Sequence, residues 1–175
     1  YRNKMSTHQE WSFIYGLLRL QRPRIAVEVG VASGGMATAI YSALCENTHD
    51  TGVEAWYTGF DLWDTHGVHG QFGQMGSALE VDMKLRDLGD RFALLQIDTQ
   101  KEQERFRQEL DQRFTLGIDF AFIDGCHSYQ GIKNDFFNIW PKMNTQGIVA
   151  FHDTAVIDGC REFIADLRTH NTVSY

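Results

Sequence analysis

Short apolar runs alternate with segments of helical spacing along this chain, and each run leads into a polar residue or a glycine. A continuous apolar run is typical of a strand that is covered on both faces, as in a parallel sheet. Right-handed helical crossovers between such strands produce a doubly wound sheet. The expected strands are residues 25–29, 55–61, 92–97, 118–124 and 147–151.

The segments around these strands have the pattern of helices. Thr7 and Glu10 have the spacing of a capping box and predict the start of an N-terminal helix within residues 1–24. In the expected helix 77–88, Leu79, Met83 and the stretch from Leu85 to Leu88 are assigned to the apolar side. The other expected helices are residues 36–44, 101–114, 131–140 and 157–168, with residues 47–54 as a polar connection.

The predicted fold is therefore α/β, with a doubly wound, Rossmann-like and mostly parallel sheet in the strand order 3-2-1-4-5. Residues 172–175 have the composition of the start of a sixth strand at the C-terminus. With 175 residues, the chain is long enough for one domain and too short for two, so we expect residues 1–175 to form a single domain.

Composition limits the partners of the chain. Lys and Arg number 16 against 23 Asp and Glu, a net charge of −7, which disfavours nucleic acid as a partner. The three cysteines form no CxxC motif and indicate reduced thiols in an intracellular, cytoplasmic protein. No apolar run has the length of a membrane span, so we expect no membrane association. The sequence is compatible with a homo-oligomer.

A glycine loop follows the first expected strand, in the pattern Glu28-x-Gly30-x-x-x-Gly34-Gly35. Glycines let a backbone approach a ligand closely, and the following helix offers unpaired N–H groups. The spacing is not that of the GxGxxG dinucleotide fingerprint. Glu28, as an acid at the strand end, suits a cationic or amine-bearing ligand. The alternative, a tight turn with no ligand, has about equal weight.

Acidic residues also end the second and third strands. In this architecture an acid at Asp61 hydrogen-bonds a ribose diol, although it can instead cap a helix or face solvent. Asp98 is a candidate contact for an adenine amine, and a cap for the following helix is an equal alternative. The predicted strand order places the first strand beside the fourth, so Gly30 and Asp124 are expected to open into one crevice.

Two further polar clusters, Asp124-x-x-His127 and His152-Asp153, follow the last two apolar strands. Their carboxylates can converge and form a site for a divalent cation, either magnesium or a transition metal. His127 titrates near neutral pH and is the candidate general base. The alternative is that the acids cap helices and the histidines are structural.

The loop 62–76 contains four glycines and is a candidate substrate lid. Asp64, His66 and His69 in this loop are a weak candidate for a second metal site, with a lid or surface histidines as the favoured interpretation. The aromatic residues Tyr41, Trp56 and Tyr57 are expected in the core.

Three blocks of this sequence, in order, resemble class I S-adenosylmethionine-dependent methyltransferases, in the branch with macrolide-sugar O-methyltransferases and cephalosporin-hydroxylase-like proteins. The first block is similar to their motif I, and the other two to the DG.H.Y and HDT blocks of that branch. The blocks are residues 27–35, 122–129 and 147–154.

The resemblance implies a role for each matching residue. The Gly30 loop, with Glu28, Ser33, Gly34 and Gly35, would hold the methionine part of S-adenosylmethionine. Asp61 would hold the ribose and Asp98 the adenine side. In metal-dependent members, acids at the positions of Asp124 and of His152-Asp153 bind magnesium, and the histidine at the position of His127 is the base. This chain departs from the pattern, because His152 stands where those enzymes have a carboxylate and suits magnesium poorly.

We therefore expect an S-adenosylmethionine-dependent methyltransferase that methylates a hydroxyl of a small molecule, with Asp124 and His127 as catalytic residues. A non-catalytic ligand-binding domain of the same fold and an NAD-type oxidoreductase are the alternatives.

Overall fold

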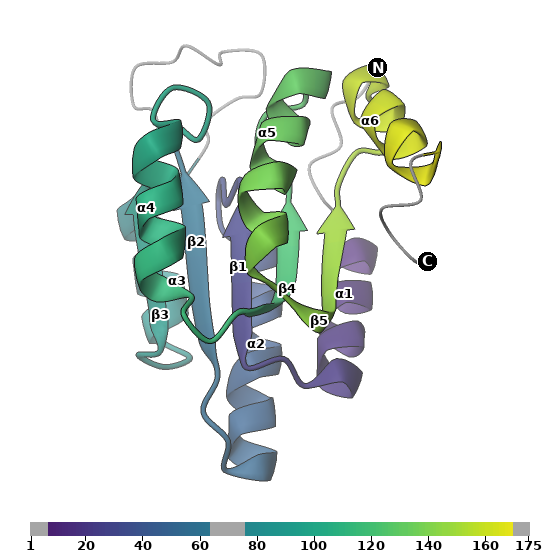
Figure 1. The fold of residues 1–175 in the computed structure, drawn as a ribbon. Coiled ribbons are helices and arrows are strands. Elements are labelled where there is room, and N and C mark those ends of the chain that lie inside the picture. The colour runs from purple at the N-terminus through teal and green to yellow at the C-terminus, as the bar shows by residue number, and fades with distance from the viewer. Residues whose placement is uncertain (1–6, 64–75, 170–175) are drawn as a thin grey trace.

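A five-stranded parallel sheet forms the centre of the computed structural model, which describes residues 7–63 and 76–169 (Figure 1). The strand order is β3-β2-β1-β4-β5, which confirms the predicted α/β fold and its topology. The strands are β1 (Ile25–Val29), β2 (Trp56–Asp61), β3 (Phe92–Gln96), β4 (Ile118–Ile123) and β5 (Met143–Phe151).

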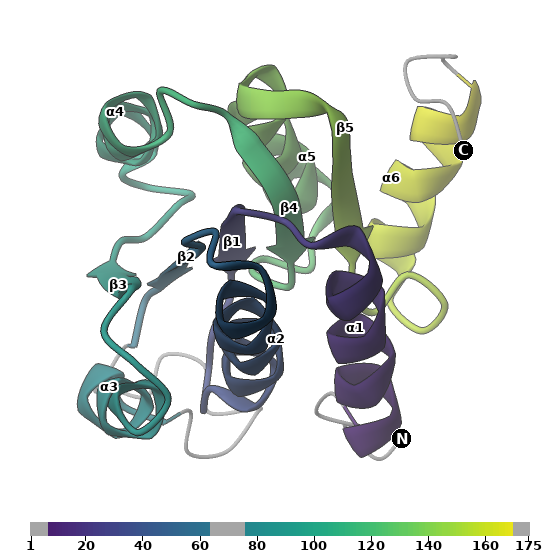
Figure 2. The ribbon, with the colours of Figure 1, turned by 90° about the horizontal axis from the view of Figure 1, so that it is seen from below.

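Helices cover both faces of this sheet, as Figure 2 shows. On one face lie α1 (His8–Gln21), α2 (Gly35–Thr51) and α3 (Ala78–Arg86). On the other lie α4 (Gln103–Arg113) and α5 (Tyr129–Ile139), which a short 3-10 helix, η1 (Trp140–Lys142), joins to β5. The last helix, α6 (Asp158–Thr169), packs against α5. Each face has its own core, with Leu18, Ile40 and Tyr57 in one and Phe60, Phe106 and Phe136 in the other.

The N-terminal helix begins as the sequence predicts. The Thr7 side chain accepts from the Glu10 N–H, and the Glu10 carboxylate accepts from the Thr7 N–H, which completes the capping box.

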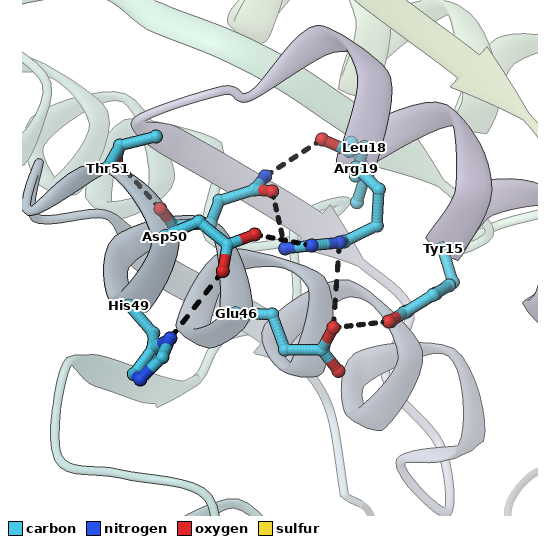
Figure 3. A network of polar contacts seen from close by, with 8 residues as sticks. Tyr15, Leu18, Arg19, Glu46, His49, Asp50 and Thr51 are labelled. Atoms are coloured by element: carbon cyan, nitrogen blue, oxygen red, sulfur yellow. Dashed lines mark hydrogen bonds and ion pairs between the residues drawn. The ribbon is translucent and has the colours of Figure 1, made fainter.

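Polar contacts fasten α1 to α2 (Figure 3). The Arg19 guanidinium donates to Asn47 over 2.9 Å and to Asp50 over 2.6 Å, and the Tyr15 hydroxyl donates to Glu46 over 2.6 Å. The buried Asn47 amide donates to the carbonyl oxygen of Leu18 over 2.9 Å. Exposed ion pairs contribute at most about 1 kcal/mol each to stability. Breaking the hydrogen bond of the buried Asn47 amide would leave a buried polar group without a partner, which destabilises the fold more. The position of α1 is thus fixed.

Two predictions about this half of the chain are wrong. Residues 47–54 are not a polar connection, because α2 continues to Thr51 and ends at Gly52 in the left-handed conformation. The polar residues of its last turns, Asn47 and Asp50, bond to α1, a tertiary contact that local composition does not reveal. Trp56 is 46% exposed at the start of β2, whereas Tyr41 and Tyr57 are buried as expected.

The apolar side of α3 was also wrongly assigned in part. Leu79 and Met83 are 68% and 62% exposed, whereas Leu85 is buried as expected, together with Val81, which was not assigned to the apolar side. Both pairs are spaced by four residues, so periodicity alone does not distinguish the two faces. Strand β5 begins at Met143, four residues before the predicted start, because Met143 pairs with Ile118 at the start of β4.

Some predicted features lie outside the described residues. They are the sixth strand at 172–175, and most of the expected lid, including Asp64, His66 and His69. Within the described part of the chain, each helix is too short or too polar to cross a membrane.

Candidate active site

The carboxyl ends of β1, β4 and β5 lie side by side, and their hydrogen bonds continue beyond the strands. The Asp124 N–H donates to the Val29 carbonyl over 2.8 Å, and the His152 N–H donates to the Ile123 carbonyl over 3.1 Å. Gly30 has a φ of +90°, and a Cβ atom there would lie 2.1 Å from the Asp124 carbonyl oxygen. Only glycine fits this contact, so Gly30 and Asp124 meet at one edge of the sheet, as predicted.

Two carboxylates and two imidazoles gather at this edge. The Oδ1 atom of Asp124 lies 3.2 Å from His127 Nε2 and 3.1 Å from His152 Nδ1. Asp153 Oδ1 lies 3.4 Å from His152 Nδ1, and its Oδ2 lies 3.5 Å from His127 Nε2. Asp153 adopts the left-handed conformation, with a φ of 56°, directly after β5. The structure therefore brings together all four residues that the sequence assigned to the catalytic and metal site.

The charges in this cluster stabilise one another. Contact with Asp124 raises the pKa of His152 to about 9, against the effect of burial, and raises the pKa of His127 as well. Burial would raise the pKa of Asp124, but the close contacts and charge of His127 and His152 outweigh burial, and the pKa falls below its ordinary value. These contacts favour the protonated form of each imidazole and the ionised form of Asp124.

The donor set fits a divalent cation. One ligand atom each from Asp124, His152 and Asp153 lies within 4.8 Å of the other two, close enough to surround one ion. Both ring nitrogens of His152 are buried, and among the described residues neither has a partner in hydrogen-bond geometry. Asp124 and Asp153 lie near Nδ1 but are not aligned for a hydrogen bond with it, so a cation that binds between them can displace the ring proton and take Nδ1 as a ligand. Carboxylate oxygen with imidazole nitrogen suits a transition metal better than magnesium.

Asp61, at the end of β2, is hydrogen-bonded to the glycine loop that follows β1. Its Oδ2 accepts from the Ala32 N–H over 2.7 Å, and its Oδ1 accepts from the Trp63 N–H over 2.7 Å. The Trp63 indole in turn donates to the Ala32 carbonyl over 3.2 Å. Gly34 precedes α2 in the left-handed conformation, with no side-chain cap, so the first N–H groups of that helix remain free of a capping side chain.

Two residues of the loop have packing roles that the sequence did not reveal. A Cβ atom on Gly35 would lie 2.4 Å from Cζ2 of Trp11, so the glycine accommodates the tryptophan of α1. The carbonyl of Ser33 accepts from Lys84 Nζ of α3 over 2.8 Å. The absence of a side chain at Gly35 is thus explained by α1 rather than by a ligand.

Glu28 lies below the loop and is 1% exposed. Its Oε2 accepts from the Tyr57 hydroxyl over 2.5 Å, and its Oε1 has no hydrogen-bond partner among the described residues. Burial raises the pKa of this carboxyl to about 8, with a further contribution from Asp124 and Asp61. The sequence predicted that Glu28 contacts a cationic or amine-bearing ligand. In the structure, its carboxyl is instead buried and bonded to the Tyr57 hydroxyl.

Asp98 caps the turn before α4, the alternative that the sequence left open. Its Oδ1 accepts from the N–H groups of Gln100 and Lys101, each over 3.0 Å. Asp98 also borders a hollow of about 540 Å³ at the carboxyl ends of β2 and β3. The other residues that line this hollow are Leu62, Leu94, Leu95, Gln96, Glu102 and Arg105.

Asp135 was not identified from the sequence. It is fully buried on α5, where burial raises its pKa to about 7, and Gln100 Nε2 donates to its Oδ1 over 2.9 Å. A Cβ atom on Gly125 would lie 3.1 Å from Asp135 Oδ2, so this carboxyl underlies the segment between Asp124 and His127. The sequence signal that could have identified Asp135 is an acidic residue among the apolar residues of an amphipathic helix.

The sequence model of a protein family described as "Methyltransferase domain" matches residues 27–154, from β1 to just beyond β5. The chain belongs to this methyltransferase family. The match includes the glycine loop and all four residues of the strand-end cluster.

One curated relative also matches most of this chain. An uncharacterised protein of Sinorhizobium fredii, y4gI, is 25% identical over 153 residues, which are 85% of this chain. The match covers only 16% of the length of that relative.

The fold is shared with solved O-methyltransferases. One is an enzyme from Bacillus cereus in complex with S-adenosylhomocysteine, with a TM-score of 0.68 and 15% identity over 98% of this chain and 74% of that chain. Another is CalS11, a TDP-rhamnose 3'-O-methyltransferase of calicheamicin biosynthesis, with a TM-score of 0.68 and 18% identity over 91% of this chain and 72% of that chain. At these identities the likeness establishes the fold.

Proposed function

We propose that this domain transfers a methyl group from S-adenosylmethionine to a hydroxyl of a small molecule. The observation that carries the proposal is the cluster of Asp124, His127, His152 and Asp153 beside the glycine loop at the switch point of the sheet. The cluster offers carboxylates, a base and a cation site next to the region where a doubly wound sheet binds its cofactor. The solved neighbours that methylate hydroxyls are consistent with such a substrate.

For the cofactor, we assign the methionine part to the loop from Gly30 to Gly34 and to the N-terminus of α2. Its carboxylate group suits the free N–H groups of that helix start. The ribose is assigned to Asp61, whose oxygens each accept one N–H and retain a lone pair for a hydroxyl. The hollow beside Asp98 is assigned to the adenine.

The remaining cofactor candidates act indirectly in this proposal. Glu28 supports the loop from below as a buried carboxyl that accepts the Tyr57 hydroxyl, and it is mostly uncharged at neutral pH because burial raises its pKa to about 8. Gly35 and Ser33 shape the loop through their contacts with Trp11 and Lys84.

In the reaction, the acceptor hydroxyl lies against the Asp124–Asp153 edge and His127 Nε2 takes its proton. The acceptor oxygen forms a bond to the methyl carbon while the carbon–sulfur bond breaks and its electron pair returns to sulfur, which leaves S-adenosylhomocysteine. A divalent cation held by Asp124, His152 and Asp153 would lower the pKa of the hydroxyl. His127 must be neutral to accept a proton, and because Asp124 raises its pKa, a given neutral fraction requires a higher pH than for an unperturbed imidazole.

Calorimetric titration with S-adenosylmethionine, S-adenosylhomocysteine and NADH tests this proposal. We expect both sulfur compounds to bind and NADH not to bind. If neither sulfur compound binds, the proposal is wrong, and binding of NADH alone would favour an oxidoreductase. A screen of hydroxyl-bearing acceptors with radiolabelled cofactor then separates a methyltransferase from a domain that only binds the ligand.

A further inference from the structure

The start of helix α1 lies against the strand-end cluster, although the two are far apart in the sequence. Glu10 Oε1 lies 3.4 Å from His152 Nε2, on the side of the imidazole ring opposite Asp124 and Asp153. The other oxygen of Glu10, Oε2, accepts the N–H of Thr7 in the capping box. One carboxylate thus contacts both the helix start and the histidine of the cluster.

Glu10 supplies an acceptor for the N–H of His152 when the other ring nitrogen binds a cation. A neutral imidazole has one N–H and one lone pair, so a cation that takes the lone pair of Nδ1 between Asp124 and Asp153 leaves the proton on Nε2, beside Glu10. With the proton on Nε2 facing Glu10, the lone pair of Nδ1 faces Asp124 and Asp153. Carboxylates that orient a ligating histidine in this way are common around metal sites and raise metal affinity.

We propose that Glu10 is a positioning residue that directs His152 Nδ1 toward a divalent transition-metal ion shared with Asp124 and Asp153. The inference rests on the proposed function, because it assigns Glu10 to the same site. Two carboxylates and one imidazole supply three protein ligands and leave coordination positions for an acceptor oxygen. On this proposal α1 is part of the active site rather than only a cover for the sheet.

The packing of α1 supports the role of Glu10. The capping box restrains the Glu10 side chain from one side, and Trp11, the next residue, packs onto Gly35 at the start of α2. The contacts of Arg19 and Asn47 then fix the far end of the helix. A residue on such an element holds its partner more accurately than one on a loop.

The chain contains a matched control for this proposal. Helix α3 begins with a capping box of the same type, in which Ser77 and Glu80 replace Thr7 and Glu10. Glu80→Ala therefore removes the same local contact as Glu10→Ala, but at a helix start where no ion pair with the strand-end cluster is found among the described residues.

The experiment titrates the full chain and its variants with Co²⁺, and follows visible absorption and heat. The absorption reports the number and geometry of the metal ligands, a property that a loss of helix stability alone does not change. S-adenosylhomocysteine affinity and thermal unfolding are measured on the same samples. The variants are Glu10→Ala, Glu10→Gln, His152→Ala and Glu80→Ala.

We expect Glu10→Ala to weaken Co²⁺ binding about tenfold, and His152→Ala about 100-fold or more with a changed absorption spectrum. Glu10→Gln should restore part of the affinity, because its single amide oxygen can accept from His152 or from Thr7 but not from both. Glu80→Ala should bind Co²⁺ as the unaltered chain does.

Several results would overturn the proposal. Equal Co²⁺ affinity in Glu10→Ala and the unaltered chain would remove Glu10 from the site, and equal losses in Glu10→Ala and Glu80→Ala would reduce its role to helix stability. No Co²⁺ binding by the unaltered chain, or no effect of His152→Ala, would remove the metal site itself. In each case retained S-adenosylhomocysteine binding leaves the proposed methyl transfer intact, whereas its absence refutes the proposed function instead.

Discussion

Replacing Glu28 by glutamine tests how the sheet interior holds a carboxyl group. Burial raises the pKa of Glu28 from the ordinary 4.5 to about 8. Between these pH values the folded chain keeps the proton that the unfolded chain has released. Stability is therefore lost as the pH rises from about 4.5 to about 8 and then levels off. Glutamine has the same shape and no proton to lose, so this loss should disappear.

The size of the effect follows from the shift in pKa. One pH unit corresponds to about 1.4 kcal/mol, so a rise from 4.5 to about 8 costs on the order of 5 kcal/mol at alkaline pH. About 3 kcal/mol of that cost is present at pH 7. Such a cost is a large part of the 5–15 kcal/mol that typically stabilises a folded domain. We expect Glu28→Gln to match the unaltered chain near pH 4.5 and to exceed its stability increasingly up to pH 8.5.

Urea unfolding at half-unit pH intervals measures this difference. Other buried groups also titrate, since burial raises the pKa of Asp135 to about 7 and contact with Asp124 raises that of His152 to about 9, but they are shared by both proteins and cancel. Glu54→Gln is the control, because Glu54 pairs with Arg91 at the surface. Its difference from the unaltered chain should stay within about 0.5 kcal/mol at all pH values. A difference for Glu28→Gln that does not grow with pH would refute the reasoning.

The remaining predictions concern the strand-end cluster. Gly30→Ala should lower the free energy of unfolding by more than 2 kcal/mol, on the order of a severe core clash, because its Cβ would lie 2.1 Å from the Asp124 carbonyl oxygen. Gly52→Ala is the control, because Gly52 also has a positive φ but an added Cβ there meets nothing within 4 Å, and it should lower the free energy of unfolding by about 1 kcal/mol. Equal losses for the two variants in urea unfolding would contradict the steric argument. His127→Ala should lower kcat about 10²–10⁴-fold with little change in cofactor affinity, and an unchanged kcat in a labelled-methyl assay would exclude His127 as the base. His152→Glu should shift the preferred ion toward Mg²⁺, and an unchanged order of metal affinities in calorimetry would show that His152 is not a ligand.

The fold and the residues of the cluster could be predicted because they follow from patterns of neighbouring residues in the sequence. The apolar runs define the strands, and a parallel sheet aligns their carboxyl ends, which places Asp124 next to His152 in the observed hydrogen-bond ladder. The capping box at Thr7 and Glu10 is likewise local, and it forms as expected. The true length of α2 could not be predicted, because its last turns are polar residues that bond to α1.

The sequence by itself determined the alternation of strands and helices, the sites where acids follow strands, and the glycine loop at the first strand. These features follow from the alternation of apolar and helical segments and from residues that are close in the chain. Only the tertiary structure decided that Tyr57 covers Glu28, that Trp11 requires the glycine at position 35, and that Glu10 meets His152. Each of these contacts joins residues on different elements, so it depends on how the helices pack on the sheet and leaves no periodic signal along the chain.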